Sequence, residues 1–270
     1  MNNQPVGIFD SGIGGVSVLR AIHELLPAED LVYFGDAAHL PYGEKSLEQI
    51  RAYSKSITEF LMRKNCKAIV IACNTASAAA LKQLRTDFPG FPFIGMEPAV
   101  KPAAEQTQTG VVGVIATTAT FQGELFASVV ERFANGVEVL RQPCPGLVQQ
   151  IEAGKLDDQE TEQMLRGWIE PMLVKNIDAL VLGCTHYPFV RKTIEKITGP
   201  TVRVIDPAPA IARQLQRVLE SQHLDADSGR KGNVEYYTSG STDAFLNTLR
   251  TLTGESGNVM HAEWNNSVLQ

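Results

Sequence analysis

Short apolar runs alternate with longer segments of mixed polarity along most of this chain. Runs such as KAIVIAC (67–73) and DALVLGC (178–184) contain few polar residues, so the two-residue alternation of a half-exposed strand is absent. Continuous apolar strands are typical of parallel sheets, because helices cover both faces of such sheets. We therefore expect buried strands at residues 6–10, 31–36, 67–73, 92–96, 111–116, 137–142, 178–184 and 202–206.

The segments between these runs have the length and apolar spacing of helices. A chain in which strands and helices alternate is predicted to have an α/β fold with mostly parallel sheets. After a polar, glycine-containing loop at 223–233, we expect a last strand near 234–238 and a helix near 241–252. The other helices are predicted at residues 15–26, 46–64, 75–87, 119–134, 158–174, 187–197 and 208–221.

The chain contains an internal repeat. The segment KNCKAIVIACNT (64–75) aligns with KNIDALVLGCTH (175–186), which places Cys73 on Cys184. Two further matches occur at nearly the same shift: VGIFDS (6–11) with VGVIAT (112–117), and MEPA (96–99) with IDPA (205–208). The repeat predicts two similar α/β lobes related by a pseudo-twofold axis, with a cleft between them.

The lobe boundaries follow from where the repeat begins again. We expect residues 98–207 to form the second lobe. Residues 208–270 are too few to form a stable domain alone, so we assign them to the first lobe together with residues 1–97.

Composition and charge narrow the class of protein. Hydrophobic residues make up 44% of the chain and charged residues 20%, and the formal net charge is −6, which is ordinary for a soluble globular protein. Because Lys and Arg form no block, we expect no nucleic-acid partner. The start, MNNQPVGIFDSG, does not resemble a signal peptide, and the apolar runs are too short to cross a membrane, so we expect a cytoplasmic protein.

The four cysteines are Cys66, Cys73, Cys144 and Cys184, and no two of them form a Cys-x-x-Cys pair. This spacing argues against a structural metal site and a dithiol redox motif. In a reducing compartment we expect four free thiols, each of which could be an ordinary small buried residue.

Polar residues follow the ends of four predicted strands, and two of these sets begin with a cysteine. In parallel α/β sheets, ligands bind beyond the carboxyl ends of the strands. If the two lobes face each other across these ends, one thiol from each lobe approaches a small ligand from opposite sides. The four sets are Asp10-Ser11, Cys73-Asn74-Thr75, Thr117-Thr118 and Cys184-Thr185-His186.

Two opposed thiols suit racemisation at a carbon acid. That reaction needs a base on one face and an acid on the other, and the roles exchange in the reverse direction. A thiol has an ordinary pKa near 8.5 and can act as base or acid near neutral pH if its surroundings lower that value. We expect a helix N-terminus after each cysteine to lower its pKa, with Asn74, Thr75 and Thr185 as capping residues.

Four motifs resemble the glutamate racemase family: FDSGIGGVSV (9–18), LPYGEKS (40–46), ACNTASA (72–78) and GCTHYP (183–188). The resemblance extends from the first strand to about residue 210. It implies a cofactor-independent racemase that interconverts L-glutamate and D-glutamate and supplies D-glutamate for peptidoglycan. We expect glutamate as the small-molecule partner, no bound metal or cofactor, and a homodimer.

The resemblance also implies roles for individual residues. Cys73 and Cys184 would transfer the protons, Asp10 would assist the first and His186 the second, and Glu152 would be a further catalytic residue near the site. Structural alternatives are a turn residue for Asp10, a buried structural histidine for His186 and an exposed helical glutamate for Glu152. The predicted substrate-binding residues are Asp10, Ser11, Pro41, Tyr42, Gly43, Asn74, Thr75, Thr117, Thr118, Thr185 and His186.

These motifs contain no Lys or Arg at the strand ends, so backbone N–H groups at helix starts would hold the substrate carboxylates. The glycines of DSGIGG would let the backbone approach the substrate closely.

Other functions fit the sequence less well. A dinucleotide enzyme would need a third glycine where Ser17 stands, and a pyridoxal-phosphate racemase would need a lysine at a strand end. A two-lobed amino-acid-binding protein without catalytic activity would give no reason for paired cysteines. An aspartate racemase of the wider aspartate/glutamate racemase superfamily remains an alternative.

Overall fold

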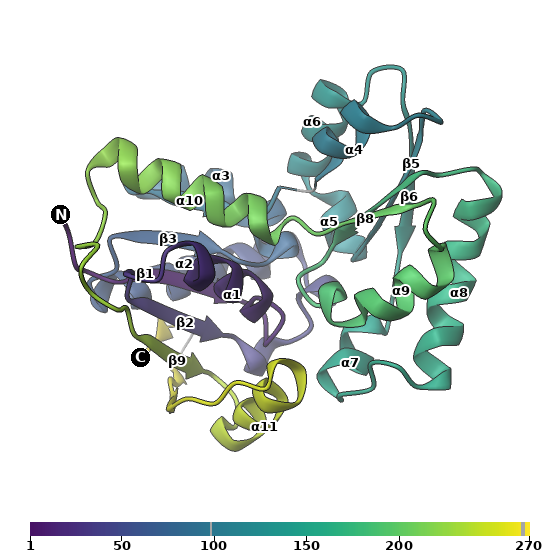
Figure 1. The fold of residues 1–270 in the computed structure, drawn as a ribbon. Helices are drawn as coiled ribbons and strands as arrows, with labels where there is room; N and C mark the ends of the chain where they lie inside the picture. Colours follow the sequence, from purple (N-terminus) through teal and green to yellow (C-terminus); the bar gives the residue numbers. More distant parts are fainter. Residues whose placement is uncertain (98, 266–267) are drawn as a thin grey trace.

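The structure is a computed structural model that describes residues 1–97, 99–265 and 268–270. Within these residues the strands form a six-stranded sheet, a four-stranded sheet and a small two-stranded sheet. Figure 1 shows two lobes side by side, each built around one of the two larger sheets.

All neighbouring strands in the first sheet are parallel, which confirms the predicted sheet type. Val6 of the central strand pairs with Leu31 on one side and Ala68 on the other. The order across this sheet is β10 (Val259–His261), β9 (Val234–Thr238), β2 (Leu31–Gly35), β1 (Val6–Asp10), β3 (Ala68–Ile71) and β4 (Phe93–Gly95).

The second sheet is also entirely parallel. Its order is β6 (Glu138–Pro143), β5 (Val111–Ala116), β7 (Ala179–Gly183) and β8 (Arg203–Ile205). This order repeats that of β2, β1, β3 and β4 in the first sheet, with β5 in the place of β1 and β7 in the place of β3.

The internal repeat is also visible in the backbone. Asn65 and Asn176, which align in the sequence, both have a positive φ, of 59° and 60°. Each lies just after a helix and before the strand that leads to a cysteine. Asparagine tolerates this left-handed conformation better than most residues, and it ends the helix sharply. In both lobes the same left-handed asparagine turn therefore leads into the strand that precedes the cysteine.

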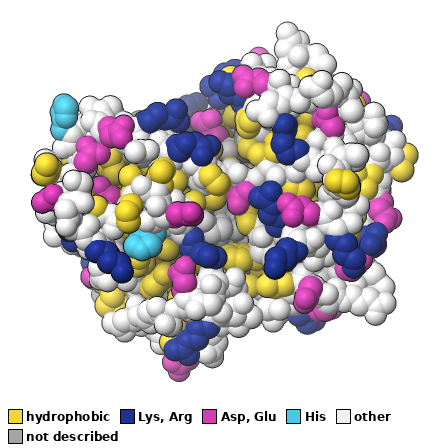
Figure 2. All heavy atoms as spheres, in the orientation of Figure 1, with side chains coloured by type: hydrophobic (Ala, Val, Ile, Leu, Met, Phe, Trp, Pro, Cys, Tyr) yellow, Lys and Arg dark blue, Asp and Glu magenta, His cyan; other side chains and the backbone are white. Residues whose placement is uncertain are grey.

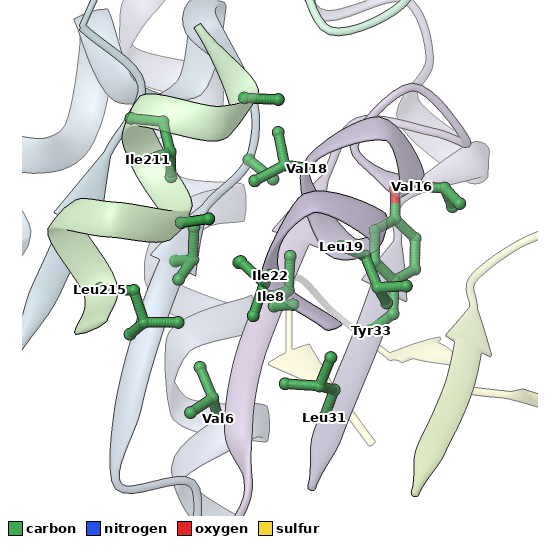
Figure 3. Packing of buried hydrophobic residues seen from close by; sticks show 14 of the residues in the cluster. Val6, Ile8, Val16, Val18, Leu19, Ile22, Leu31, Tyr33, Ile211 and Leu215 are labelled. Carbon is green, nitrogen blue, oxygen red and sulfur yellow. The ribbon is translucent and has the colours of Figure 1, made fainter. Parts of the chain in front are cut away.

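Helices cover both faces of the first sheet. On one face α1 (Val16–Leu25), α10 (Ala208–Gln222) and α11 (Thr242–Thr253) bury apolar residues against β1 and β2. Figure 3 shows Ile211 and Leu215 of α10 and Ile22 of α1 gathered over Ile8. On the other face lie α2 (Leu47–Arg63) and α3 (Asn74–Asp87). The buried apolar runs of the sequence are explained by this two-sided cover.

The second sheet is covered in the same manner. One face carries α7 (Leu147–Glu152), α8 (Gln159–Val174) and α9 (Arg191–Thr198). The other carries α4 (Val100–Gln106) and α6 (Glu124–Phe133). The remaining short elements are η1 (Ala37–His39), η2 (Tyr42–Glu44), α5 (Thr118–Gln122), η3 (Tyr187–Val190), β11 (Trp264–Asn265) and β12 (Val268–Leu269).

Two helix predictions need correction, and two short helices were missed. The single helix expected at 119–134 is two helices, because Gly123 between them is extended, with φ −71° and ψ 141°. The helix expected at 187–197 begins with the 3-10 turn η3. The short helices α4 and α7 were not expected, because six or seven residues are too few to show a helical period.

The C-terminal segment returns to the first sheet. From residue 208 onward it supplies α10, β9, α11 and β10, and β9 pairs with β2. The predicted boundary between residues 97 and 98 adjoins a position outside the described residues. The division into residues 1–97 plus 208–270 and residues 98–207 stays a prediction.

The surface carries charges of both signs. In Figure 2, Lys and Arg side chains are interspersed with Asp and Glu on the face shown. None of the helices in the described ranges is long and apolar enough to cross a membrane.

The lobes pack closely where α3 of the first lobe meets α5 and α6 of the second. Gly123, which separates α5 from α6, makes this packing possible. A Cβ atom at Gly123 would lie only 2.5 Å from the Cβ of Ala78 in α3. Since α3 starts directly after Cys73 and α5 directly after Thr117, this contact sets the distance between two walls of the cleft.

We expect Gly123→Ala to lower the free energy of unfolding by about 1–3 kcal/mol, because the added methyl group overpacks this contact. The control is Gly167→Ala in α8, where a Cβ would meet nothing within 4 Å. Removing a glycine from a helix interior there should stabilise the protein by about 0.5–1 kcal/mol. Urea unfolding measures both changes, and equal stability of the two variants would contradict the role of Gly123.

Candidate active site

A small pocket lies between the lobes, with an empty volume of about 270 Å³. The lining contains no Lys or Arg. The first lobe contributes Ser11, Pro41, Tyr42, Gly43, Cys73, Asn74 and Thr75, and the second contributes Thr117, Val148, Cys184, Thr185 and His186.

A wider surface groove runs over α1 and β9 of the first lobe, but no cysteine lines it. The smaller pocket is therefore the candidate site, because it brings together chemically reactive groups. Within the described ranges, no group of three or more His, Cys, Asp or Glu side chains is arranged to hold a metal ion.

The two thiols reach this pocket from equivalent strands. Cys73 follows β3 and is the N-cap of α3, whereas Cys184 follows β7. A turn and the 3-10 helix η3 come after Cys184, so the α-helix expected directly after it is absent. The repeat thus places both thiols at one pocket but gives them different surroundings.

Cys73 is only 4% exposed. The backbone N–H of Ala76 donates a hydrogen bond to its sulfur at 3.4 Å, and the thiol faces the hydroxyl of Ser11 at 4.0 Å. Burial raises the pKa of Cys73 well above its ordinary value, the charge of Asp10 raises it further, and the Ala76 hydrogen bond only partly opposes them. The N–H at the helix start therefore lowers this pKa as expected, but the net shift is upward, because loss of solvent outweighs one N–H donor.

Asp10 lies behind Cys73, outside the pocket lining, and is fully buried. Its carboxylate accepts a hydrogen bond from the backbone N–H of Gly15 at 2.9 Å and one from the hydroxyl of Thr185 at 3.4 Å. Burial raises the pKa of Asp10 against the opposing effects of His186, Gly15 and Cys73. Asp10 is thus both a turn residue of the glycine-rich loop and a neighbour of the first thiol.

His186 connects the second thiol to Glu152. Its Nδ1 lies 3.8 Å from the sulfur of Cys184, and its Nε2 lies 2.7 Å from Oε1 of Glu152. The prediction that Glu152 lies near the site matches this position, and Glu152 is half-buried, unlike the exposed helical glutamate of the alternative.

In the His186–Glu152 pair, each group favours the charged form of the other. Burial alone would lower the pKa of His186, but its hydrogen bonds to Cys184 and Glu152 and their charges raise that pKa well above the ordinary value. Burial alone would raise the pKa of Glu152, but the bond to His186, the charge of His186 and the N–H of Ile13 lower it. The pair is therefore an imidazolium and a carboxylate near neutral pH.

The glycine-rich loop of the first lobe packs directly against the His186–Glu152 pair of the second lobe. A Cβ atom at Gly14 would lie 2.4 Å from Nδ1 of His186, and one at Gly12 would lie 2.5 Å from Oε1 of Glu152. The backbone N–H of Ile13 donates to the same oxygen of Glu152 at 3.2 Å. The sequence predicts that these glycines admit the substrate, but in the structure they admit side chains of the other lobe.

Three threonine hydroxyls form a closed cluster across the lobes. Thr75 lies 2.8 Å from Thr117 and 3.3 Å from Thr120, and Thr117 lies 2.9 Å from Thr120. Thr120 was not among the predicted residues, although its position three residues after the N-cap Thr117 could have indicated it. The predicted Thr118 is exposed and does not line the pocket.

Asn74 lines the pocket with a buried side-chain amide that lacks hydrogen-bond partners among the described residues. Its side chain is 3% exposed in total, and neither its amide nitrogen nor its amide oxygen has a hydrogen-bond partner among the described residues. Buried polar atoms are nearly always paired in folded proteins, so this amide is free to bind a polar ligand. Val148 also lines the pocket, and it was missed because it lies on the short helix α7.

Comparison with known proteins identifies close relatives over most of the chain. Residues 6–215 match the family model described as Asp/Glu/Hydantoin racemase. A glutamate racemase of Stutzerimonas stutzeri (strain A1501) is 50% identical over 252 residues, which cover 93% of this chain and 95% of that protein.

Solved structures agree with this match. The structure of a glutamate racemase isoform from Bacillus anthracis superimposes with a TM-score of 0.90 at 30% identity, covering 99% of this chain and 100% of that one. A glutamate racemase from Francisella tularensis subsp. tularensis SCHU S4 in complex with D-glutamate has a TM-score of 0.84 at 32% identity, covering 96% and 97%.

The His186–Glu152 pair predicts a pH-dependent contribution to stability. Because the pKa of His186 is raised in the folded protein, protonation of His186 stabilises the fold. This stabilisation is complete below pH 6.5, the ordinary pKa of histidine, and is lost as pH rises through the folded-state pKa. Because the pKa of Glu152 is lowered in the folded protein, ionisation of Glu152 also stabilises the fold. This stabilisation is complete above pH 4.5, the ordinary pKa of glutamate, and is lost as pH falls through the folded-state pKa. Glu152→Gln should therefore cost most stability between about pH 4.5 and 6.5.

The measurement is urea unfolding of parent and variant across this range and about two units on either side. The control is Glu160→Gln, which removes the exposed pair with Lys155 and should change stability little at any pH. A loss for Glu152→Gln that does not vary with pH would contradict the ion pair.

Proposed function

The chain belongs to the Asp/Glu/Hydantoin racemase family, and we propose that Cys73 and Cys184 are the two acid/base groups of its reaction. The enzyme is an amino-acid racemase, an isomerase that interconverts L-glutamate and D-glutamate. The observation that carries our proposal is that one thiol from each lobe lines the same small pocket at equivalent strand ends.

The reaction requires one proton to leave Cα and another to arrive on the opposite face. A thiolate on one side takes the Cα proton, so the Cα–H bond breaks and an S–H bond forms. The thiol on the other side then gives its proton to Cα and becomes the thiolate. One S–H bond is exchanged for another, and the charge of the enzyme does not change. By the resemblance, Cys184 deprotonates L-glutamate and Cys73 deprotonates D-glutamate.

The partners of the two thiols suit these exchanged roles. Cys73 is a thiol beside Asp10, whose raised pKa lets it share the proton that Cys73 must release before acting as a base. Cys184 faces the imidazolium of His186, which is the charge that a thiolate would pair with. Glu152 holds this imidazole in orientation and keeps it protonated.

The substrate is held by amide, hydroxyl and backbone groups. We assign its ammonium and carboxylate groups to Asn74, whose side chain has no hydrogen-bond partner among the described residues, and to the hydroxyls of Ser11, Thr75, Thr117 and Thr185. Pro41, Tyr42 and Gly43 close one side of the pocket. Because Thr118 is exposed, Thr120 replaces it here as the residue that orients the hydroxyls of Thr75 and Thr117.

We further infer that the protein acts in the cytoplasm as a homodimer. All four cysteines are unpaired, which is the expected state of thiols in a reducing compartment. D-Glutamate made there is available for peptidoglycan synthesis, the general role of enzymes with this activity.

Serine in place of either catalytic cysteine should abolish nearly all racemisation, because a full turnover uses both thiols and an alkoxide is not formed near neutral pH. The half-reactions should separate. Cys73→Ser should exchange the α-hydrogen of L-glutamate with deuterium from solvent faster than that of D-glutamate, and Cys184→Ser should show the opposite preference. Circular dichroism follows racemisation, and proton NMR in deuterium oxide follows the exchange.

The matched control is Cys66→Ser, another buried thiol that does not line the pocket and should leave racemisation near that of the parent. Near-normal racemisation by Cys73→Ser or Cys184→Ser would refute the two-thiol mechanism. Loss of activity without opposite preferences would refute the assignment of one face to each thiol.

Glutamate should react much faster than aspartate without added cofactor. One methylene alone changes binding by about 1–3 kcal/mol, but a shorter substrate also leaves the donors for the distal carboxylate unpaired, so we expect a ratio of kcat/KM above about 100. Polarimetry with both enantiomers of each amino acid measures this ratio. Comparable rates for aspartate would show that the pocket does not select by length.

A further inference from the structure

Asp36 lies outside the pocket but gathers an unusual number of hydrogen bonds. It follows β2 at the carboxyl edge of the first sheet and is 0% exposed. Its carboxylate accepts bonds from four side chains: Tyr42 Oη at 2.7 Å, His39 Nδ1 at 2.9 Å, Ser239 Oγ at 2.7 Å and Trp264 Nε1 at 2.8 Å.

The two carboxylate oxygens face two different parts of the chain. Oδ2 accepts from Tyr42 and makes the shorter of the two contacts with His39, and both belong to the loop between β2 and α2. Oδ1 accepts from Ser239, which follows β9, and from Trp264, which lies in β11. Asp36 therefore joins a loop that lines the pocket to a C-terminal segment that does not.

Aromatic packing reinforces this junction. The ring of His39 stacks on Tyr53 of α2, with centroids 3.8 Å apart and planes inclined by 18°. Trp264 meets both rings edge-on, at 4.9 Å from His39 and 5.7 Å from Tyr53. The loop is thus held from three sides, by Asp36, by α2 and by the C-terminal segment.

The position of this loop matters because it carries Pro41, Tyr42 and Gly43 into the pocket. Gly43 also lies against the second lobe, where a Cβ atom would come within 3.1 Å of Thr117. A small displacement of the loop would therefore alter one wall of the pocket and its fit to Thr117. The thiols and their partners Asp10 and His186 lie on other elements.

We propose that Asp36 is a positioning residue for substrate binding, which uses the C-terminal segment to hold the 37–44 loop against the substrate. This inference rests on the proposed function for the identity of the ligand. A carboxylate is needed because the four groups around it all act as donors, and only an acceptor with two oxygens satisfies them together. In Asp36→Asn the amide nitrogen faces donors, so at least one of them loses its partner.

The expected result for Asp36→Asn is a rise of about tenfold in KM for both enantiomers of glutamate, with kcat within about twofold of the parent. Ser239→Ala and Trp264→Phe each remove one donor to the Asp36 carboxylate from the C-terminal side. Both should raise KM in the same direction by a smaller factor. If Asp36→Asn does not fold, these two variants still test the proposal. An unchanged KM in both Ser239→Ala and Trp264→Phe would overturn it.

The matched control is Asp178→Asn in the second lobe. Asp178 accepts bonds from the hydroxyl of Thr107 and the backbone N–H groups of Gln108 and Thr109, at the amino end of β7 and away from the pocket. This variant should lose stability while KM stays unchanged. An equal rise of KM in Asp178→Asn, or a fall of kcat with unchanged KM in Asp36→Asn, would overturn the positioning role.

A binding measurement separates this proposal from the proposed function. Calorimetric titration of D-glutamate into Cys73→Ser and into Cys73→Ser/Asp36→Asn compares affinities without turnover, and the second Kd should be about tenfold higher. Equal affinities would overturn the role of Asp36 even if the parent racemises glutamate. A weaker Kd in the double variant would support that role even if the parent does not racemise glutamate.

Discussion

The structure depends on the close contact between the glycine-rich loop of the first lobe and the His186–Glu152 pair of the second. Gly12 and Gly14 leave no room for a side chain there, and the N–H of Ile13 donates to Glu152. Two more hydrogen bonds cross the lobes beside it, from Ser17 to the carbonyl of Thr185 and from Thr185 to Asp10. Without this contact the second thiol would lose its oriented imidazole, and the two strand ends would not face one pocket.

Burial at this contact sets the chemistry of the two thiols. Removing solvent raises the pKa values of both Cys73 and Asp10. On the other side His186 keeps its proton despite burial, because Cys184 and Glu152 both favour its charged form. The repeat therefore supplies symmetric geometry, while unlike neighbours give the two halves unlike proton affinities.

The C-terminal segment shows how distant parts of the chain support one pocket wall. It adds β9 and β10 to the first sheet and then places Ser239 and Trp264 against Asp36. Such contacts between residues about 200 positions apart leave no periodic pattern in the sequence. They hold the 37–44 loop, which has little regular structure of its own beyond two 3-10 turns.

The sequence by itself determined the parallel α/β fold, the repeat and the polar residues at the strand ends, because these depend on local periodicity and on where an apolar run stops. Cys73, Cys184 and most of the predicted pocket residues lie where the strand ends predicted. Tertiary structure alone decided that Thr120 and Val148 lie at the pocket while Thr118 does not, and that Glu152 pairs with His186. It also decided that the pKa of Cys73 is raised. The physical reason is that exposure and partnership depend on which distant groups exclude water from a residue, and local sequence carries no record of them.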